Sequence, residues 1–359
     1  MSIITQIEVF EKLGVFLGQF SNPGEQETRR MPWLEELNSM FFRPVESVIK
    51  SSHIHNPWFT EENVRYAIKI TGRSLNRESM TSWLSNYSPS GYEKKPKTVA
   101  VVIAGNIPMV GFHDMMCVLI SGHNLLAKLS ARDDGMLQII ADILCFLDDR
   151  FEGRISFEEG RLKDFDAVIA TGSDNTARYF EYYFGKYPNI IRKNRNSVAI
   201  LDGTETDEEL KGLADDVFRY FGLGCRSVSK LYIPENYNFE RFIEISGIYK
   251  HFINHNHWAN NYEYQRAIHL INQSPHLDTG FFLIREDTSP SSPISVINYV
   301  KTEDTEIAVN LIKREIDKLQ CIVGKSSIQE FMIPFGKAQN PELNDYPDNV
   351  DTLEFLFNL

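Results

Sequence analysis

The sequence predicts an α/β fold built around a parallel sheet, and three observations support this prediction. Between residues 97 and 201, short apolar runs rich in β-branched residues alternate with amphipathic helical stretches. The first 95 residues show helical periodicity instead, and a second α/β region follows residue 203. Strands that alternate with right-handed helical crossovers form a parallel sheet covered on both faces, and such sheets bind ligands at the carboxyl ends of their strands.

Length and charge limit the classes of protein that fit. The chain has 359 residues, so we expect two closely joined domains. Its net charge of −12, with no block of like charges, argues against nucleic acid or an anionic membrane surface as the main partner. The first eight residues lack the basic run of a signal peptide, and no apolar run approaches the length of a membrane span. We therefore expect a cytoplasmic protein without a membrane span.

The expected elements follow from hydrophobic periodicity. Residues 1–95 are predicted to be mainly helical, because large apolar side chains recur at three- and four-residue intervals. The first sheet is predicted to contain strands at residues 98–104, 124–129, 166–170 and 197–201. The helices between them are expected at residues 109–121, at 135–149 and after residue 173 to about 184.

The second α/β region begins with an amphipathic helix predicted at residues 207–221. Thr206 or Asp207 would cap this helix, and Gly222 would end it. A strand at residues 230–234 and a helix at 303–319 are expected farther along the chain.

Cys225 is the candidate nucleophile. It stands among small residues between a predicted helix and a predicted strand, and the neighbouring Arg226 and Lys230 would favour its thiolate. The alternative is an ordinary loop cysteine, because cysteine commonly serves as a small apolar residue. The other three cysteines are weaker candidates, since two fall in apolar helical stretches and one in a strand, namely Cys117, Cys145 and Cys321.

Other motifs give less direct signals. No G-x-G-x-x-G or Walker A sequence occurs. Thr171-Gly-Ser173 joins a strand to a helix, where free amides and the helix dipole suit a phosphate, but helix capping by Ser173 or Asp174 explains it equally well.

The histidines do not predict a metal site. His251, His255 and His257 lie close in sequence, but there is no H-E-x-x-H motif and no nearby cysteine, so we expect surface or hydrogen-bonding roles. His113 could face a substrate or be a hydrogen-bonded core residue. We expect no metal.

Five segments, in this order, resemble motifs of the aldehyde dehydrogenase superfamily. They are Gly105-Asn-Ile-Pro108, Gly122-His-Asn-Leu-Leu-Ala-Lys-Leu-Ser130, Thr171-Gly-Ser173, Gly224-Cys-Arg-Ser-Val-Ser-Lys230 and Pro334-Phe-Gly336. Over nearly the whole chain, the closest likeness is to the acyl-CoA reductase branch of the LuxC type. The resemblance implies an aldehyde dehydrogenase-like fold with four segments: a helical segment at 1–95, a Rossmann-like cofactor domain at 96–203, a catalytic domain at 204–325 and a C-terminal return segment at 326–359.

Two departures from the superfamily pattern are informative. Aldehyde-oxidising members carry a glutamate that activates the water for thioester hydrolysis, and the matching stretch here is Ile191-Arg-Lys-Asn-Arg-Asn196. Without that carboxylate, an acyl-enzyme would survive hydrolysis and could be reduced. The acidic residue that binds the adenosine ribose is replaced by Ala131, and Arg132 follows, which suits the 2′-phosphate of NADP.

The resemblance implies that Cys225 attacks an acyl thioester, either acyl-CoA or an acylated carrier or enzyme, and that NADPH reduces the resulting enzyme thioester to an aldehyde. Asn106 and the backbone N–H of Cys225 would bind the oxyanion. By the same resemblance Lys128 and Ser130 would contact the adenosine ribose or its phosphate, and Gly172 and Ser173 the pyrophosphate. Glu286 would hold the nicotinamide ribose.

Several alternatives remain open at this point. One is an aldehyde or semialdehyde dehydrogenase of the same superfamily. Another is a catalytically silent partner that binds acyl groups or nucleotides, and a third is a cysteine hydrolase or acyltransferase. A homodimer is expected from the superfamily.

Overall fold

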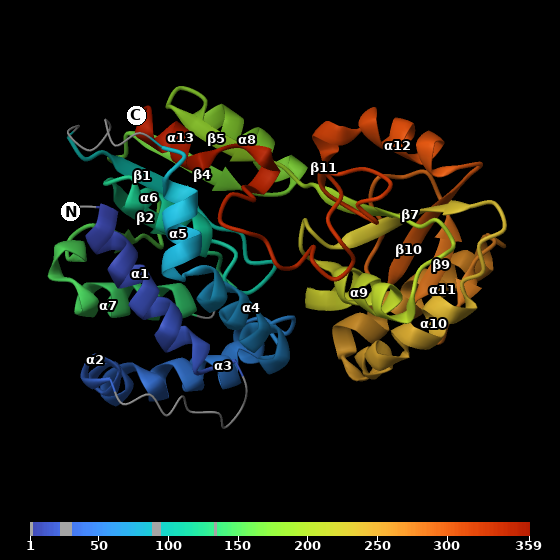
Figure 1. The fold of residues 1–359 in the computed structure, drawn as a ribbon, viewed down its shortest axis with the longest axis horizontal. Coiled ribbons are helices and arrows are strands. Elements are labelled where there is room, and N and C mark those ends of the chain that lie inside the picture. Colours follow the sequence, from blue (N-terminus) through green and yellow to red (C-terminus); the bar gives the residue numbers. More distant parts are fainter. Residues whose placement is uncertain (1–2, 22–30, 88–94, 133–134) are drawn as a thin grey trace. The chain divides into compact units, whose positions relative to one another are not determined.

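The computed structural model describes residues 3–21, 31–87, 95–132 and 135–359. Contacts divide the chain into two units, shown in Figure 1. Unit 1 comprises Met1–Lys193 with Glu342–Leu359, and unit 2 comprises Asn194–Pro341. The boundary expected between residues 203 and 204 therefore falls within unit 2, and the return segment at 326–359 is shared between the two units. Three parts of the predicted helical segment lie outside the described residues, namely 1–2, 22–30 and 88–94.

Unit 1 begins with helices, as the periodicity predicts. Two of them start with side-chain caps: Thr60 accepts the N–H of Asn63, and Asn76 accepts the N–H of Ser79. The first and fourth helices lie so close that a Cβ on Gly72 would be 3.1 Å from the carbonyl oxygen of Gly14. The helices are α1 (Ile3–Gly18), α2 (Pro32–Leu37), α3 (Arg43–His55), α4 (Glu61–Ser74) and α5 (Arg77–Leu84), with a π-helical turn at Asn38–Phe42 before α3.

A five-stranded parallel sheet forms the centre of unit 1, with strand order β3-β2-β1-β4-β5. On one face, Val99 and Val101 pack into the same core as the N-terminal helices, whereas Ala100 joins a smaller core on the other face. The strands are β1 (Thr98–Val102), β2 (Asn124–Lys128), β3 (Ile155–Phe157), β4 (Ala167–Thr171) and β5 (Asn189–Arg192). The accompanying helices are α6 (Phe112–Ile120), α7 (Met136–Leu147) and α8 (Asp174–Phe184).

The predicted fourth strand belongs to the other unit. The strand beside β4 is β5, and the predicted strand at residues 197–201 is β6 (Asn196–Ile200) of the second sheet. The prediction was wrong because β3 and β5 have only three and four residues, too few to show a pattern.

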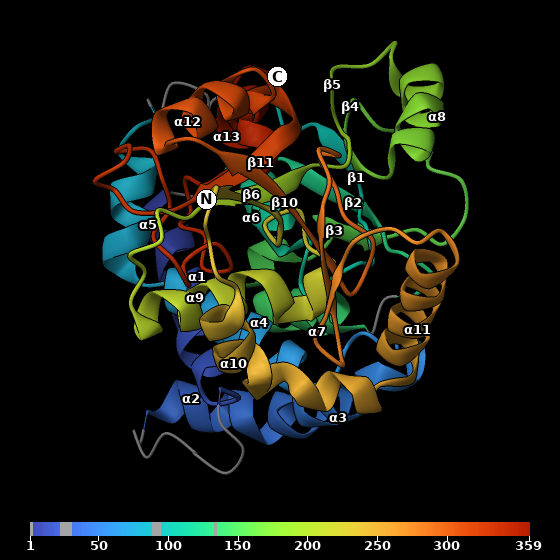
Figure 2. The same cartoon turned by 90° about the vertical axis from the view of Figure 1, so that its right-hand side faces the viewer.

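Unit 2 contains a six-stranded sheet in the order β11-β6-β7-β10-β9-β8, which is parallel except for the pair β8 and β9. Figure 2 shows α9 and α10, two of the helices of this unit, next to each other. The other strands are β7 (Val228–Pro234), β8 (Leu277–Asp278), β9 (Leu283–Glu286), β10 (Val296–Thr302) and β11 (Leu319–Val323). The helices are α9 (Asp207–Phe218), α10 (Glu240–Ser246), α11 (Asn256–Ile271) and α12 (Thr305–Lys313).

Two helices of unit 2 are shorter than predicted. Helix α9 starts at a capping box formed by Thr206 and Glu209, so Thr206 is its cap. The α-helix ends at Phe218 instead of residue 221, because Tyr220 and Phe221 adopt left-handed backbone angles. Helix α12 ends at Lys313 instead of 319, and the chain then turns into β11.

The end of the chain returns to unit 1 with a short helix, α13 (Thr352–Phe357). Trp83 donates its Nε1–H to the hydroxyl of Tyr346 at 2.8 Å, and the Tyr87 hydroxyl donates to Asp351 at 2.7 Å. Polar bonds over long sequence separations therefore fasten this segment. Within the described part of the chain, no helix is long and apolar enough to cross a membrane.

Candidate active site

Cys225 lies in a turn between α9 and β7, and its side chain is partly exposed. The turn closes with a bond from Ser227 N–H to the Gly224 carbonyl at 3.0 Å. The hydroxyl of Ser197, which is fully buried, donates to the Cys225 carbonyl at 2.9 Å and accepts the N–H of Cys321 at 3.1 Å. A buried side chain on strand β6 thus fixes the main chain of the candidate nucleophile.

Strand β6 has an irregular register with both neighbours at this point. Ser197 pairs with Val228, but the next residue pairs with Lys230, so β7 has an extra residue here. A corresponding shift occurs in β11 between Leu319 and Cys321. Bulges of this kind redirect side chains and are common next to active sites.

The backbone that leads to Cys225 is strained. Tyr220, Phe221 and Gly222 have φ angles of 55°, 57° and 70°, and only glycine adopts this region without cost. The Phe221 ring lies 4.4 Å from the ring of Phe252 and 4.6 Å from that of His255, centroid to centroid. Aromatic packing of Phe221 therefore stabilises a backbone conformation that is unfavourable for non-glycine residues, as is found near functional sites.

The two cations expected near Cys225 have other partners. Arg226 donates its Nε–H to the Ala338 carbonyl at 2.5 Å. Lys230 is buried, donates to the Thr288 carbonyl at 3.0 Å and lies 3.8 Å from Glu315, and burial lowers its pKa. Stabilisation of a Cys225 thiolate by these residues stays a prediction.

Asp216 of α9 is a site residue that the sequence analysis missed. Its carboxylate is fully buried and accepts the N–H groups of Gly336 and Ala338 at 2.7 and 3.0 Å. Burial raises the pKa of Asp216 to about 7, although the two N–H donors oppose the rise. The signal in the sequence is an aspartate between Leu213 and Val217 on the apolar stripe of α9, where a charged residue needs a specific partner.

The Pro334-Phe-Gly336 segment packs on the same helix. Gly336 has a φ angle of 78°, and a Cβ on Gly212 of α9 would lie 2.8 Å from the Gly336 nitrogen. Both glycines are therefore required by a close approach of two backbones. The resemblance to the closing superfamily motif thus corresponds here to a structural contact with α9.

The expected oxyanion and ribose residues lie at the ends of two adjacent strands of unit 1. Asn106 is exposed in the loop after β1. Buried Asn56 donates to the Gly105 carbonyl at 3.0 Å, and a Cβ on Gly105 would lie 2.5 Å from the Ser130 hydroxyl, so the loops after β1 and β2 meet. Lys128 at the end of β2 donates to the carbonyls of Glu159 and Gly160, and Arg132 is exposed.

The Thr171-Gly-Ser173 turn joins β4 to α8 and is held locally. Ser173 is the N-cap of α8 and accepts the N–H of Thr176 at 3.3 Å, so the capping interpretation is correct. A Cβ on Gly172 would lie 2.9 Å from side-chain atoms of Thr176 and Phe180, which explains the glycine by packing. Phosphate binding by Gly172 and Ser173 stays a prediction.

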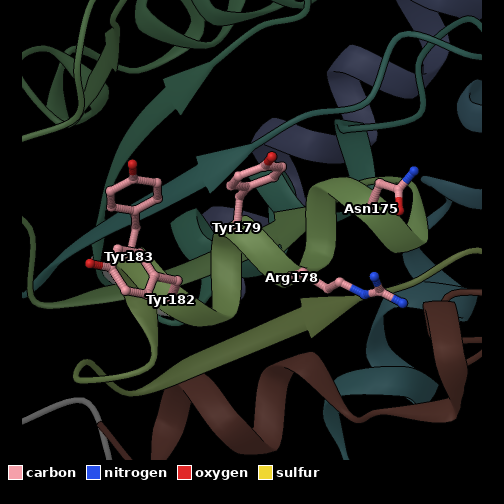
Figure 3. Close-up of a pocket in the computed structure, with 5 residues that line it drawn as sticks. All are labelled: Asn175, Arg178, Tyr179, Tyr182 and Tyr183. Atoms are coloured by element: carbon pink, nitrogen blue, oxygen red, sulfur yellow. The ribbon is translucent and has the colours of Figure 1, made fainter.

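An open hollow of about 740 Å³ lies along α8. Figure 3 shows that its five lining side chains all project from this helix, with the tyrosines toward one end and Arg178 and Asn175 toward the other: Asn175, Arg178, Tyr179, Tyr182 and Tyr183. None of the site residues predicted from the sequence lines it.

The stretch that replaces the water-activating glutamate has a structural role. Arg192 is almost fully buried and forms an ion pair with Asp114 through its two terminal guanidinium nitrogens, and it donates to the Thr352 hydroxyl at 2.9 Å. Arg195 donates to the Leu319 carbonyl at 3.1 Å. Both arginine side chains therefore bind other groups of this chain.

Glu286 ends β9 in unit 2 and is exposed. It pairs in register with Tyr299, whose pKa is raised by burial and then by the charge of this glutamate. Cys225 and Glu286 thus belong to unit 2, and the other predicted site residues belong to unit 1, namely Asn106, Lys128, Ser130, Arg132, Gly172 and Ser173.

The histidines have protein partners. His113 Nε2 lies 2.8 Å from the Leu343 carbonyl oxygen, and burial lowers its pKa, so it is the hydrogen-bonded core residue of the two alternatives. His255 caps α11, and His251 lies 2.9 Å from the Ile248 carbonyl oxygen. No group of three or more histidine, cysteine, aspartate or glutamate side chains suited to a metal occurs among the residues that the structure describes.

Comparison with known proteins identifies the family and the fold. The model of the acyl-CoA reductase (LuxC) family matches residues 54–244, which is more than half of the chain. No curated protein matches the sequence.

Among solved structures, aldehyde dehydrogenase 21 from Physcomitrella patens in complex with succinate is 14% identical, with a TM-score of 0.65 over 100% of this chain and 84% of that one. An acetylating aldehyde dehydrogenase from Geobacillus thermoglucosidasius is 10% identical, with a TM-score of 0.62 over 99% and 90% of the two chains. The NAD-bound Δ-pyrroline-5-carboxylate dehydrogenase from Mycobacterium tuberculosis is 12% identical, with a TM-score of 0.57 over 99% and 77%. These likenesses confirm the predicted aldehyde dehydrogenase-like fold.

Proposed function

The chain belongs to the acyl-CoA reductase (LuxC) family, and on that premise we propose that it reduces an acyl-CoA or another acyl thioester to an aldehyde with NADPH. The family and the fold support the coarser statement that the protein is an oxidoreductase for aldehydes or their acyl derivatives. The cofactor, the thioester intermediate and the fatty acyl substrate are parts of the proposal.

The first step would take place at Cys225. Its thiolate would attack the carbonyl carbon of the acyl thioester, the carbonyl electrons would move to the oxygen, and the carrier thiolate would leave as the carbonyl re-forms. We assign oxyanion stabilisation to the Cys225 N–H and the Asn106 side-chain amide. The Ser197 bond to the Cys225 carbonyl supports this role of the turn, because it fixes the peptide plane that follows the nucleophile.

The chemistry of the donor groups fits a nicotinamide dinucleotide phosphate in unit 1. Lys128 and the residues Ser130 and Arg132 lie at and after the end of β2, and Gly172 and Ser173 stand between β4 and α8, so positive charge and N–H groups occur at the ends of the two strands that flank β1. NADPH, when bound, supplies the hydride that converts the enzyme thioester into aldehyde and Cys225 thiolate. Arg132 would favour the 2′-phosphate, and Glu286 would hold the nicotinamide ribose.

One observation favours reduction of the acyl-enzyme over its hydrolysis to a carboxylic acid. In the stretch at residues 191–196 there is no carboxylate to activate water, and Arg192 within it is committed to a buried ion pair with Asp114. An acyl-enzyme at Cys225 would therefore resist hydrolysis and persist until it is reduced.

The test is NADPH oxidation with a series of acyl-CoA substrates of increasing chain length, with the aldehyde trapped and identified. Cys225→Ala should lower the rate by about a thousandfold or more, whereas Cys145→Ala, which changes another partly exposed cysteine, should leave it unchanged. Failure of labelled acyl-CoA to acylate Cys225 would overturn the proposal. Faster oxidation of aldehydes with NADP than reduction of acyl-CoA would favour an aldehyde dehydrogenase instead.

A further inference from the structure

We infer that Asp216 is a positioning residue for the Cys225 turn and that it acts through the loop at residues 336–339. This inference rests on the proposed role of Cys225 as the nucleophile. The role that we assign to Asp216 passes through hydrogen bonds of unit 2.

The first link joins Asp216 to the loop. One carboxylate oxygen accepts the Gly336 N–H at 2.7 Å, and the other accepts the Ala338 N–H at 3.0 Å. Both oxygens are therefore used as acceptors, and hydrogen bonds to an ionised carboxylate are stronger than neutral ones. An asparagine at this position would offer one acceptor and turn an N–H donor toward the second backbone N–H.

The second link joins the loop to the turn. Arg226 donates its Nε–H to the Ala338 carbonyl at 2.5 Å, so the peptide units on both sides of Ala338 are bound, one by Asp216 and one by Arg226. Gln339 donates its Nε2–H to the Ser227 hydroxyl at 3.3 Å. The two residues that follow Cys225 in the chain are thus both bonded to the loop that Asp216 holds.

The turn is held from a second direction by Ser197, which binds the Cys225 carbonyl from strand β6. The loop and the strand together restrict the movement of the turn. A reactive group needs such restriction because it must meet its substrate in one geometry. Among the residues that make these hydrogen bonds, Asp216 is the one whose ionisable side chain is fully buried.

Protonation of Asp216 would remove one of the two hydrogen bonds that fix the loop at residues 336–339. A proton on one carboxyl oxygen makes that oxygen a donor that faces a backbone N–H, so one of the two bonds is lost. Burial raises the pKa of Asp216 to about 7, the charge of Asp215 also raises it, and the charge of Arg226 opposes them. Lys337 is the charged residue that stands between Gly336 and Ala338 in the sequence.

The inference is tested by the rate at which iodoacetamide alkylates Cys225, resolved by peptide mass spectrometry from pH 5.5 to 9. We expect the wild-type rate to depend on two ionisations, one at Cys225 and one near pH 7. Asp216→Asn should lose the ionisation near pH 7. It should also lower the acylation rate by acyl-CoA roughly 10- to 100-fold, with little change in KM. Leu210→Ala, which truncates a buried side chain earlier on α9, is the control and should keep both ionisations.

Arg226→Lys provides an independent check, because it keeps the positive charge and removes the Nε–H donor. If Asp216 and Arg226 act through the same loop, the double variant should be little worse than either single variant. Additive effects, or an Asp216→Asn protein with the wild-type rate and pH profile, would overturn the inference. If wild-type Cys225 is not acylated while Asp216→Asn still loses the ionisation near pH 7, the proposed function fails and the positioning role stands.

Discussion

Two buried aspartates hold the end of the chain in different ways. In unit 1, Asp114 forms an ion pair with Arg192, which also binds Thr352 of α13. In unit 2, Asp216 accepts two backbone N–H groups from the loop at residues 336–339. One carboxylate thus faces a permanent cation, and the other faces neutral amides.

The difference shows how the partner of a buried carboxylate determines its response to pH. Burial lowers the pKa of Arg192, but the charge and hydrogen bonds of Asp114 outweigh it and raise that pKa, so the guanidinium stays charged. The pKa of Asp216 rises to about 7. We therefore expect the anchor in unit 1 to be constant and the anchor in unit 2 to change near neutral pH.

Arg192→Ala should have the largest effect on stability. It leaves Asp114 buried without its cation, and breaking a buried pair in this way typically costs about 3–5 kcal/mol. Denaturant unfolding measures the change. The matched control is Lys193→Ala, which removes an exposed ion pair with Glu181 and should cost about 0.5 kcal/mol or less. Equal losses in the two variants would contradict the ion-pair anchor.

Asp216→Asn tests the pH-dependent anchor. Because the folded pKa of Asp216 is raised from 3.8 to about 7, its contribution to stability is fully present below pH 3.8 and is lost as the pH rises through about 7. Between these limits the free energy of unfolding should fall by up to about 1.4 kcal/mol per pH unit relative to the variant. A constant difference between wild type and Asp216→Asn from pH 5 to 8 would show that the carboxyl does not titrate there.

Ser197→Ala tests a third, neutral anchor, which should show no such pH dependence. The change leaves the Cys321 N–H and the Cys225 carbonyl without the buried hydroxyl, at a cost of about 1–3 kcal/mol. Ser229→Ala in β7 is the control, because the buried Ser229 hydroxyl has no hydrogen-bond partner among the described residues, and the change should be close to neutral. Thermal unfolding of both variants at two pH values distinguishes the outcomes.

Ser173 variants should give the smallest change, because that turn is held by its own helix. Ser173→Ala removes the cap of α8 and should cost about 1 kcal/mol. Ser173→Asp keeps a capping oxygen but adds negative charge, so it should preserve stability and weaken NADPH binding. Calorimetric titration measures the binding, and an unchanged Kd in Ser173→Asp would place the pyrophosphate elsewhere.

The elements with a strong local pattern could be predicted from the sequence. The runs that became β1, β2 and β4 are apolar and bounded by glycine or polar residues, and the turn with Cys225 follows a clearly amphipathic helix. Strands β3 and β5 are too short for a pattern. The assignment of β6 to a sheet depends on β7 and β11, which local periodicity does not reveal.

The contacts around Cys225 could not be predicted because they join residues far apart in sequence. Ser197 reaches the turn across 28 positions, and Asp216 reaches Ala338 across 122. The positions of Arg226 and Lys230 in the sequence suggest cations for a thiolate, whereas the structure gives both of them main-chain carbonyl partners. The sequence shows Asp216 only as a polar residue on an apolar helix face. It does not show that the partners of this residue are the N–H groups of Gly336 and Ala338.

The return of residues 342–359 to unit 1 affects the order in which the protein is completed during synthesis. Unit 2 is one continuous stretch, Asn194–Pro341, and all of its residues are made before Glu342 is added. Unit 1 cannot complete its packing until the last residues are made. The bond between Trp83 and Tyr346 spans 263 positions, and His113 bonds to the Leu343 carbonyl. Contacts at such separations form slowly. We therefore expect unit 1, although it begins the chain, to reach its final packing after unit 2. A released chain that ends at residue 341 should contain a folded unit 2 and an incompletely packed unit 1.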